Sequence, residues 1–120
     1  MSGSAGELAQ QEDLGTSGTF RTALLHTRDV ASAASFYAAV FGWELHDSTT
    51  ASSFTLRSQR VAGIRRTTDE QNLWVPYVAV DDVAASSDAA VRAGATVIDA
   101  GIISDPEGAI LGLCTPNEPI

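Results

Sequence analysis

An internal repeat constrains the fold of this chain more than any other feature. Residues 24–45 have the pattern of a strand, a helix and a strand, with Asp29 at the start of the helix and Gly42 at its end. Residues 77–98 repeat this order, with Asp82 and Gly94 in the matching places. A repeat of this length predicts two copies of one supersecondary unit.

Further alternating segments extend each copy. In the first copy we expect strands at residues 19–26, 43–47, 53–57 and 61–65 and a helix at 30–41, and in the second we expect strands at 74–80, 95–99, 101–103 and 109–115 and a helix at 83–93. Each copy is therefore a βαβββ unit. The strand at 101–103 is very short, and Asp105–Gly108 predicts a turn.

Size and composition favour one soluble domain. The chain has 120 residues, a formal net charge of −8 and no lysine, which argues against binding to nucleic acid or to an anionic membrane surface. Its single cysteine permits no internal disulfide, so we expect a cytoplasmic protein. It has neither an apolar run of membrane-spanning length nor the pattern of a signal peptide.

The domain boundaries follow from the composition. We expect a flexible N-terminal segment at residues 1–18, with a possible short helix around Glu7–Leu14. One domain follows at 19–116, made of repeats at 19–66 and 73–116, and residues 117–120 form a tail.

Two motifs give a family resemblance. The first runs from Asp29 through Phe36-Tyr37 to Gly42-Trp43, and the second, DPEGAILGL, runs from Asp105 to Leu113. From about Phe20 to Pro116 the chain resembles the vicinal oxygen chelate superfamily of glyoxalases, bleomycin-resistance proteins and extradiol dioxygenases. The resemblance implies an α+β fold in which two tandem βαβββ units form one cupped mixed sheet with the helices outside. It also implies a ligand cavity in the cup and a homodimer.

The resemblance also implies where metal ligands would lie. Enzymes of this superfamily place one ligand on each of four strands, and these positions correspond to Thr22, Gly63, Val75 and Gly112 here. These four residues cannot assemble a divalent metal site, and a shift of one residue brings in no better ligand. We therefore expect no metal and no cofactor, unlike a glyoxalase or an extradiol dioxygenase.

Side chains two residues apart on a strand share a face, which predicts the lining of the cup. This count also places Val61 on the cup face, and Trp43 and Trp74 at its opening. The predicted ligand-binding residues are Phe20, Thr22, Leu24, His26, Trp43, Phe54, Leu56, Gly63, Arg65, Trp74, Val75, Tyr77, Ile110, Gly112 and Cys114. Such a lining suits a small organic ligand with an apolar or aromatic body.

Three of these residues are also candidate catalytic groups. His26 could act as acid or base, and Arg65 or Tyr77 could stabilise an oxyanion. Each also has a structural interpretation: His26 could bond the following turn, Arg65 could begin a solvated linker, and Tyr77 could pack in the core. Cys114 has no activating neighbour in the sequence and suits a small buried residue better than a nucleophile.

Three functions fit these features. The first is a metal-independent binding protein that sequesters or carries a natural-product-like ligand, or confers resistance to it. The alternative is a metal-free cyclase or isomerase of a polyketide-like intermediate, with His26 as the acid or base. The third is an interaction domain with an empty cup, so the sequence leaves open whether the protein is an enzyme.

Overall fold

The computed structural model describes residues 16–49, 51–68 and 71–120. Most of the predicted flexible segment, and the possible helix at 7–14, lie outside the described residues. The described residues divide into two compact units. We call Thr22–Val75 with Pro119–Ile120 the first unit, and Pro76–Glu118 with residues 16–21 the second unit.

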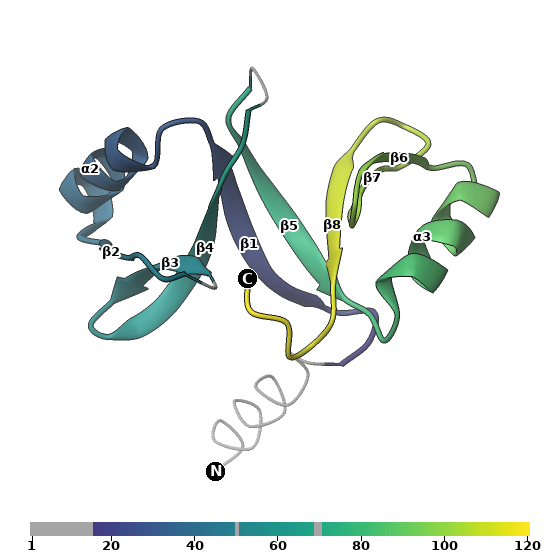
Figure 1. Ribbon diagram of the computed structural model, residues 1–120, viewed down its shortest axis with the longest axis horizontal. Helices are drawn as coiled ribbons and strands as arrows, with labels where there is room; N and C mark the ends of the chain where they lie inside the picture. The colour runs from purple at the N-terminus through teal and green to yellow at the C-terminus, as the bar shows by residue number, and fades with distance from the viewer. Residues whose placement is uncertain (1–15, 50, 69–70) are drawn as a thin grey trace, which may run out of the picture. The chain divides into compact units, whose positions relative to one another are not determined.

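The first unit is built on four strands and one helix. Its strands lie in the order β2-β3-β4-β1, with β1 parallel to β4 and the other neighbours antiparallel (Figure 1). The elements are β1 (Phe20–Thr27), α2 (Val30–Phe41), β2 (Glu44–His46), β3 (Ser52–Leu56) and β4 (Gln59–Arg66). Helix α2 packs beside β2 and β4.

The second unit repeats this arrangement. Its strands lie in the order β5-β8-β7-β6, with β5 parallel to β8 and the others antiparallel, and α3 packs on β6 and β8. The elements are β5 (Leu73–Ala79), α3 (Val83–Arg92), β6 (Thr96–Asp99), β7 (Ile102–Ser104) and β8 (Ile110–Cys114). The α+β fold with two βαβββ repeats, mixed strand directions and helices outside the sheet is therefore confirmed.

The repeated aspartates begin both helices. Asp29 Oδ1 accepts a hydrogen bond from Ser32 N at 2.9 Å, and Asp82 Oδ1 accepts one from Ala85 N at 2.9 Å. Gly42 ends α2 in the left-handed conformation, with φ of 76°. The helices have 12 and 10 residues, and within the described part of the chain no helix is long and apolar enough to cross a membrane.

The core of the first unit lies between α2 and one face of its sheet. Phe54 of β3 has no exposed surface, and it packs with Ala62 and Ile64 of β4 and Leu25 of β1. Tyr37 of α2 packs against this cluster. The opposite face carries the residues that alternate with these, and we call it the pocket face.

A β-bulge in β4 changes which side chains reach the pocket face. Phe54 is the partner of Ala62, but the next residue, Thr55, is the partner of Arg60. Val61 is therefore the extra residue, and strict alternation fails there. The bulge brings Arg60 to the pocket face, and the placement of Val61 on the cup face stays a prediction.

The turn before the bulge is also unusual. Arg57 and Ser58 join β3 to β4 in a two-residue connection, with φ of 53° and 67°. Positive φ at both positions is typical of a type I′ hairpin turn, which normally favours Asn or Gly. The turn and the bulge together fix the position of Arg60.

Candidate ligand-binding site

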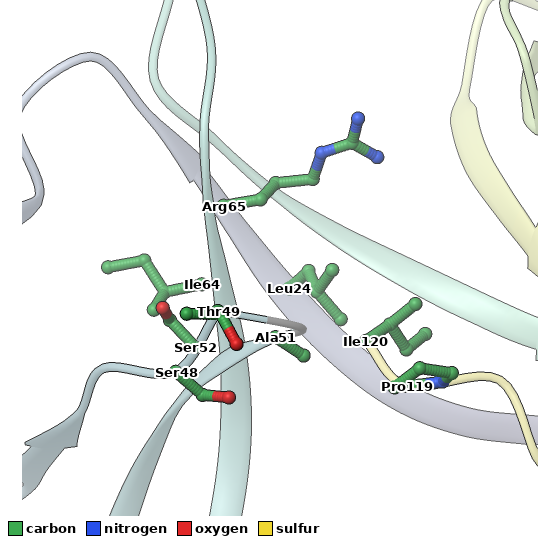
Figure 2. A pocket seen from close by; sticks show the side chains of 9 residues that line it. All are labelled: Leu24, Ser48, Thr49, Ala51, Ser52, Ile64, Arg65, Pro119 and Ile120. Atoms are coloured by element: carbon green, nitrogen blue, oxygen red, sulfur yellow. The ribbon is translucent and has the colours of Figure 1, made fainter.

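A pocket of about 290 Å³ opens on the first unit. Leu24 of β1, Ile64 and Arg65 of β4, and the end of the chain surround it, together with the connection from β2 to β3 (Figure 2). Its lining residues are Leu24, Ser48, Thr49, Ala51, Ser52, Ile64, Arg65, Pro119 and Ile120. The pocket combines aliphatic side chains with three hydroxyl groups and one guanidinium group.

Strand register brings four of the predicted site residues together. In the parallel pair of β1 and β4, Leu24 is the partner of Gly63 and His26 is the partner of Arg65. Leu24 is buried, His26 is half-buried and Arg65 is exposed. These residues lie on the pocket face, as the alternation predicts.

Arg60 connects two strands and the end of the chain. Its Nη1 donates to Thr22 Oγ1 at 2.8 Å, and its Nη2 donates to the main-chain oxygen of Ile120 at 2.6 Å. A Cβ added at Gly63 would lie 2.7 Å from Arg60 Nη2 and 2.8 Å from Leu24 Cδ1. The space that a side chain at position 63 would need is therefore filled.

The second unit fills its corresponding glycine position with an aromatic ring. Tyr77 of β5 is the register partner of Gly112 of β8, and a Cβ added at Gly112 would lie 2.5 Å from the Tyr77 ring. Tyr77 is only 3% exposed. Cys114, on the same face of β8, is buried, and its Sγ lies 3.7 Å from the Val78 main-chain oxygen, while Ile110 is half-buried.

Three predicted site residues lie beside α2, away from the pocket face. Phe54, Trp43 and Trp74 gather around Tyr37 of α2, with ring centroids 5.7, 5.3 and 5.5 Å from its ring. Trp74 Nε1 donates to Tyr37 Oη at 2.8 Å. We call these four residues the Tyr37 cluster; Phe54, Trp43 and Tyr37 belong to the core beside α2, whereas Trp74 is 38% exposed.

The remaining predicted residues occupy diverse environments. Phe20 is 63% exposed at the start of β1, whereas Val75 is 1% exposed. Leu56 lines a second hollow of about 380 Å³ together with Arg57, Gln59, Arg60 and Val61. Their contact with a ligand stays a prediction.

Sequence reasoning missed three parts of the site. Arg60 was missed because the bulge at Val61 reverses the alternation on which the prediction rested. Ser48, Thr49 and Ser52 have the composition of an ordinary polar turn. Pro119 and Ile120 carry no local signal, because only the fold brings them to β1 and β4.

The described residues offer no recognisable metal site. Among residues 16–49, 51–68 and 71–120, no three His, Cys, Asp or Glu side chains come close enough to hold one metal ion. Of the four positions that the resemblance assigns to metal ligands, only Thr22 has a side-chain oxygen, and this Oγ1 accepts a hydrogen bond from Arg60.

The two βαβββ repeats define the chain as a protein of the vicinal oxygen chelate superfamily. The sequence profile of the glyoxalase-like domain matches residues 22–114, so the chain belongs to this family. It is also similar to proteins named "Putative glyoxylase CFP32" from Mycobacterium bovis and Mycobacterium tuberculosis, with 34% identity in each case. Each alignment covers 117 residues, 80% of this chain and 45% of the relative, so the chain spans less than half of the relatives' length.

Replacement of Gly112 by Ala tests the packing of Tyr77. We expect Gly112→Ala to lower the free energy of unfolding by about 1–3 kcal/mol, because the new methyl group overlaps the Tyr77 ring. Thermal or urea unfolding measures the change. In a Tyr77→Leu background the same replacement should cost clearly less, since the shorter side chain frees space. Equal costs in both backgrounds would show that the ring does not restrict position 112.

Proposed function

We propose that this protein binds a small organic ligand with an apolar or aromatic, natural-product-like body and does so without a metal ion. Its role would be sequestration, transport or resistance. We also propose that it works in the cytoplasm, where its single thiol, Cys114, stays reduced.

One observation carries the proposal of metal independence. At the two glycine positions that correspond to metal ligands, the space for a longer side chain is filled, by Leu24 and Arg60 at Gly63 and by Tyr77 at Gly112. A ligand side chain could not be restored at either position without moving these neighbours. Divalent coordination also requires several oxygen, nitrogen or sulfur donors, which Gly and Val side chains lack.

The pocket on the first unit supports the binding of a small organic molecule. Leu24 offers aliphatic surface, and Ser48, Thr49 and Ser52 offer hydroxyl groups that can bond to polar substituents. The volume of about 290 Å³ lies near the lower end of small-molecule sites. A compact ligand, or one part of a larger polycyclic ligand, fits this space best.

Metal analysis and ligand binding test the proposal together. We expect protein purified without chelator to contain far less than one divalent ion per chain. It should bind a fluorescent apolar probe, N-phenyl-1-naphthylamine, with the same affinity before and after EDTA treatment. A thermal-shift screen of polycyclic antibiotics and polyketide-like compounds would then identify the ligand class.

Two outcomes would contradict the proposal. One equivalent of tightly bound Zn, Ni, Mn or Fe per chain would show that the protein is a metalloprotein. Failure of the probe and of every compound to bind would favour an interaction domain with an empty site.

A second candidate function is a metal-free cyclase or isomerase. The observation that favours it is the pairing of His26 with Arg65, because β1 and β4 place an imidazole beside a guanidinium group that lines the pocket. The imidazole could transfer a proton while the guanidinium group stabilises an enolate oxygen. Tyr77 lies in the second unit, so this candidate requires only His26 and Arg65.

His26→Ala separates the two functions, with His46→Ala as a matched control. His46 lies on β2 and is exposed. If the protein is a binder, His26→Ala should change probe affinity by less than about fivefold, since one half-buried contact is lost. If it is a cyclase or isomerase, turnover of a polyketide-like substrate should fall about 10²–10⁴-fold in His26→Ala only. Unchanged turnover in His26→Ala would remove the catalytic assignment.

We further propose that a second copy of the chain covers the outer face of α2, giving a homodimer. Phe36, Val40 and Phe41 are 58%, 52% and 54% exposed on this helix. A helix that is apolar on both faces is normally covered on both. A self-complementary contact between two such faces would satisfy this requirement.

Val40→Lys tests the dimer, and Val91→Lys is its matched control. Val91 is 50% exposed on α3, so the two replacements place the same charge at equally exposed valines on the two helices. We expect Val40→Lys to raise the dimer dissociation constant at least about tenfold, because a buried ammonium group is costly. Val91→Lys should have little effect by sedimentation equilibrium. A wild-type monomer, or equal effects of both variants, would contradict this interface.

A further inference from the structure

Arg60 of the first unit lies beside two positions that correspond to metal ligands in the superfamily's enzymes. Its guanidinium group bonds Thr22 Oγ1 and lies against Gly63, the two positions in this unit that correspond to metal ligands on β1 and β4. A fixed positive charge therefore stands next to the backbone where a metal-bearing relative would place a cation. A guanidinium group can bind ligand oxygen atoms as a cation does, with hydrogen-bond direction added.

The hydrogen-bond acceptor of Arg60 indicates which class of ligand this arginine can bind. Nη2 donates to the main-chain oxygen of Ile120 at 2.6 Å, while the Ile120 residue lines the pocket beside Leu24 (Figure 2). Ile120 thus presents a main-chain oxygen acceptor to Arg60 and a branched apolar side chain to the pocket. An organic molecule with the same two parts could replace it.

The charges near the pocket favour an anion over a neutral acceptor. Arg65 lines the pocket, and Arg60, which lines the second hollow, donates a hydrogen bond to the pocket residue Ile120, in a chain whose formal net charge is −8. Among the described residues that line the pocket none is acidic. The nearby Asp47 carboxylate accepts a hydrogen bond from Ser52 Oγ at 2.6 Å.

We propose that Arg60 is the anion-binding residue of this pocket and that Pro119–Ile120 occupies the place of the ligand. The ligand is then an organic oxyanion, such as a carboxylate or enolate, attached to a compact apolar body. Binding displaces Pro119–Ile120 and transfers the Arg60 hydrogen bond to the ligand. This inference rests on the proposed binding function and adds the chemical class of the ligand.

Two probes with similar apolar bodies test the role of the charge. 8-Anilinonaphthalene-1-sulfonate carries an anionic group, and N-phenyl-1-naphthylamine carries none. A variant that lacks Pro119 and Ile120 should bind the sulfonate probe about tenfold more tightly than the full chain, because the competing segment is gone. Fluorescence titration measures both affinities.

Arg60→Gln is then introduced into both the full chain and the shortened variant. We expect it to weaken binding of the sulfonate probe to the shortened variant about tenfold, the lower end of the effect of a charged hydrogen bond, since Arg60 is exposed. The neutral probe should change less than about twofold. Arg66→Gln is the matched control, because it removes the same charge from the same strand.

The outcomes distinguish this inference from the proposed function. Equal weakening of both probes by Arg60→Gln, or no effect on either, would overturn the role of Arg60 while leaving the binding function intact. Failure of both probes to bind any variant would overturn both proposals. Arg60→Lys, with thermal unfolding as a check on folding, should keep most of the preference for the sulfonate probe because it keeps the charge.

Discussion

The packing of Phe54 beneath α2 decides which face of the first unit remains for a ligand. This side chain has no exposed surface, and its register partner is Ala62. Because side chains alternate along a strand, burial of Ala62 and Ile64 toward the helix turns Gly63 and Arg65 to the opposite face. The Tyr37 cluster stabilises the packing of Phe54 beneath α2 through ring contacts and through the hydrogen bond from Trp74 to Tyr37. No aromatic residue lines the pocket, whose lining is aliphatic and hydroxyl side chains with Arg65.

The bulge at Val61 changes the chemistry of the pocket face. Without it, an aliphatic side chain would stand two residues before Gly63 on that face. With it, Arg60 becomes the partner of Thr55 and reaches Thr22 and Ile120. The positive φ of Arg57 and Ser58 carries a conformational cost, which the paired strands on either side offset. The positive φ angles of the turn and the bulge at Val61 therefore both contribute to the placement of the Arg60 guanidinium group.

The sequence predicted the elements of the fold well because their signals are local. The helix at 30–41 was predicted with the bounds that the structure shows, and both aspartate caps act as expected. The pairings of Leu24 with Gly63 and of Tyr77 with Gly112 also agree with the predicted faces. Alternation separates two faces of a strand but does not tell which one a helix covers, so it could not show that Phe54 packs beneath α2. Arg60 and Ile120 depend on a bulge and on a contact between residues 60 positions apart, for which one sequence carries no signal.

In the two repeats, different side chains occupy the space beside the equivalent glycines Gly63 and Gly112. Gly63 lies beneath a guanidinium group and an aliphatic side chain, whereas Gly112 lies beneath the ring of Tyr77, which is nearly fully buried. In the first unit a pocket opens beside Leu24 and Arg65, and the nearby Arg60 is hydrogen-bonded to Ile120. In the second unit the buried Tyr77 ring packs against Gly112. This asymmetry explains how a fold made of two similar units can present different chemistry in each of them.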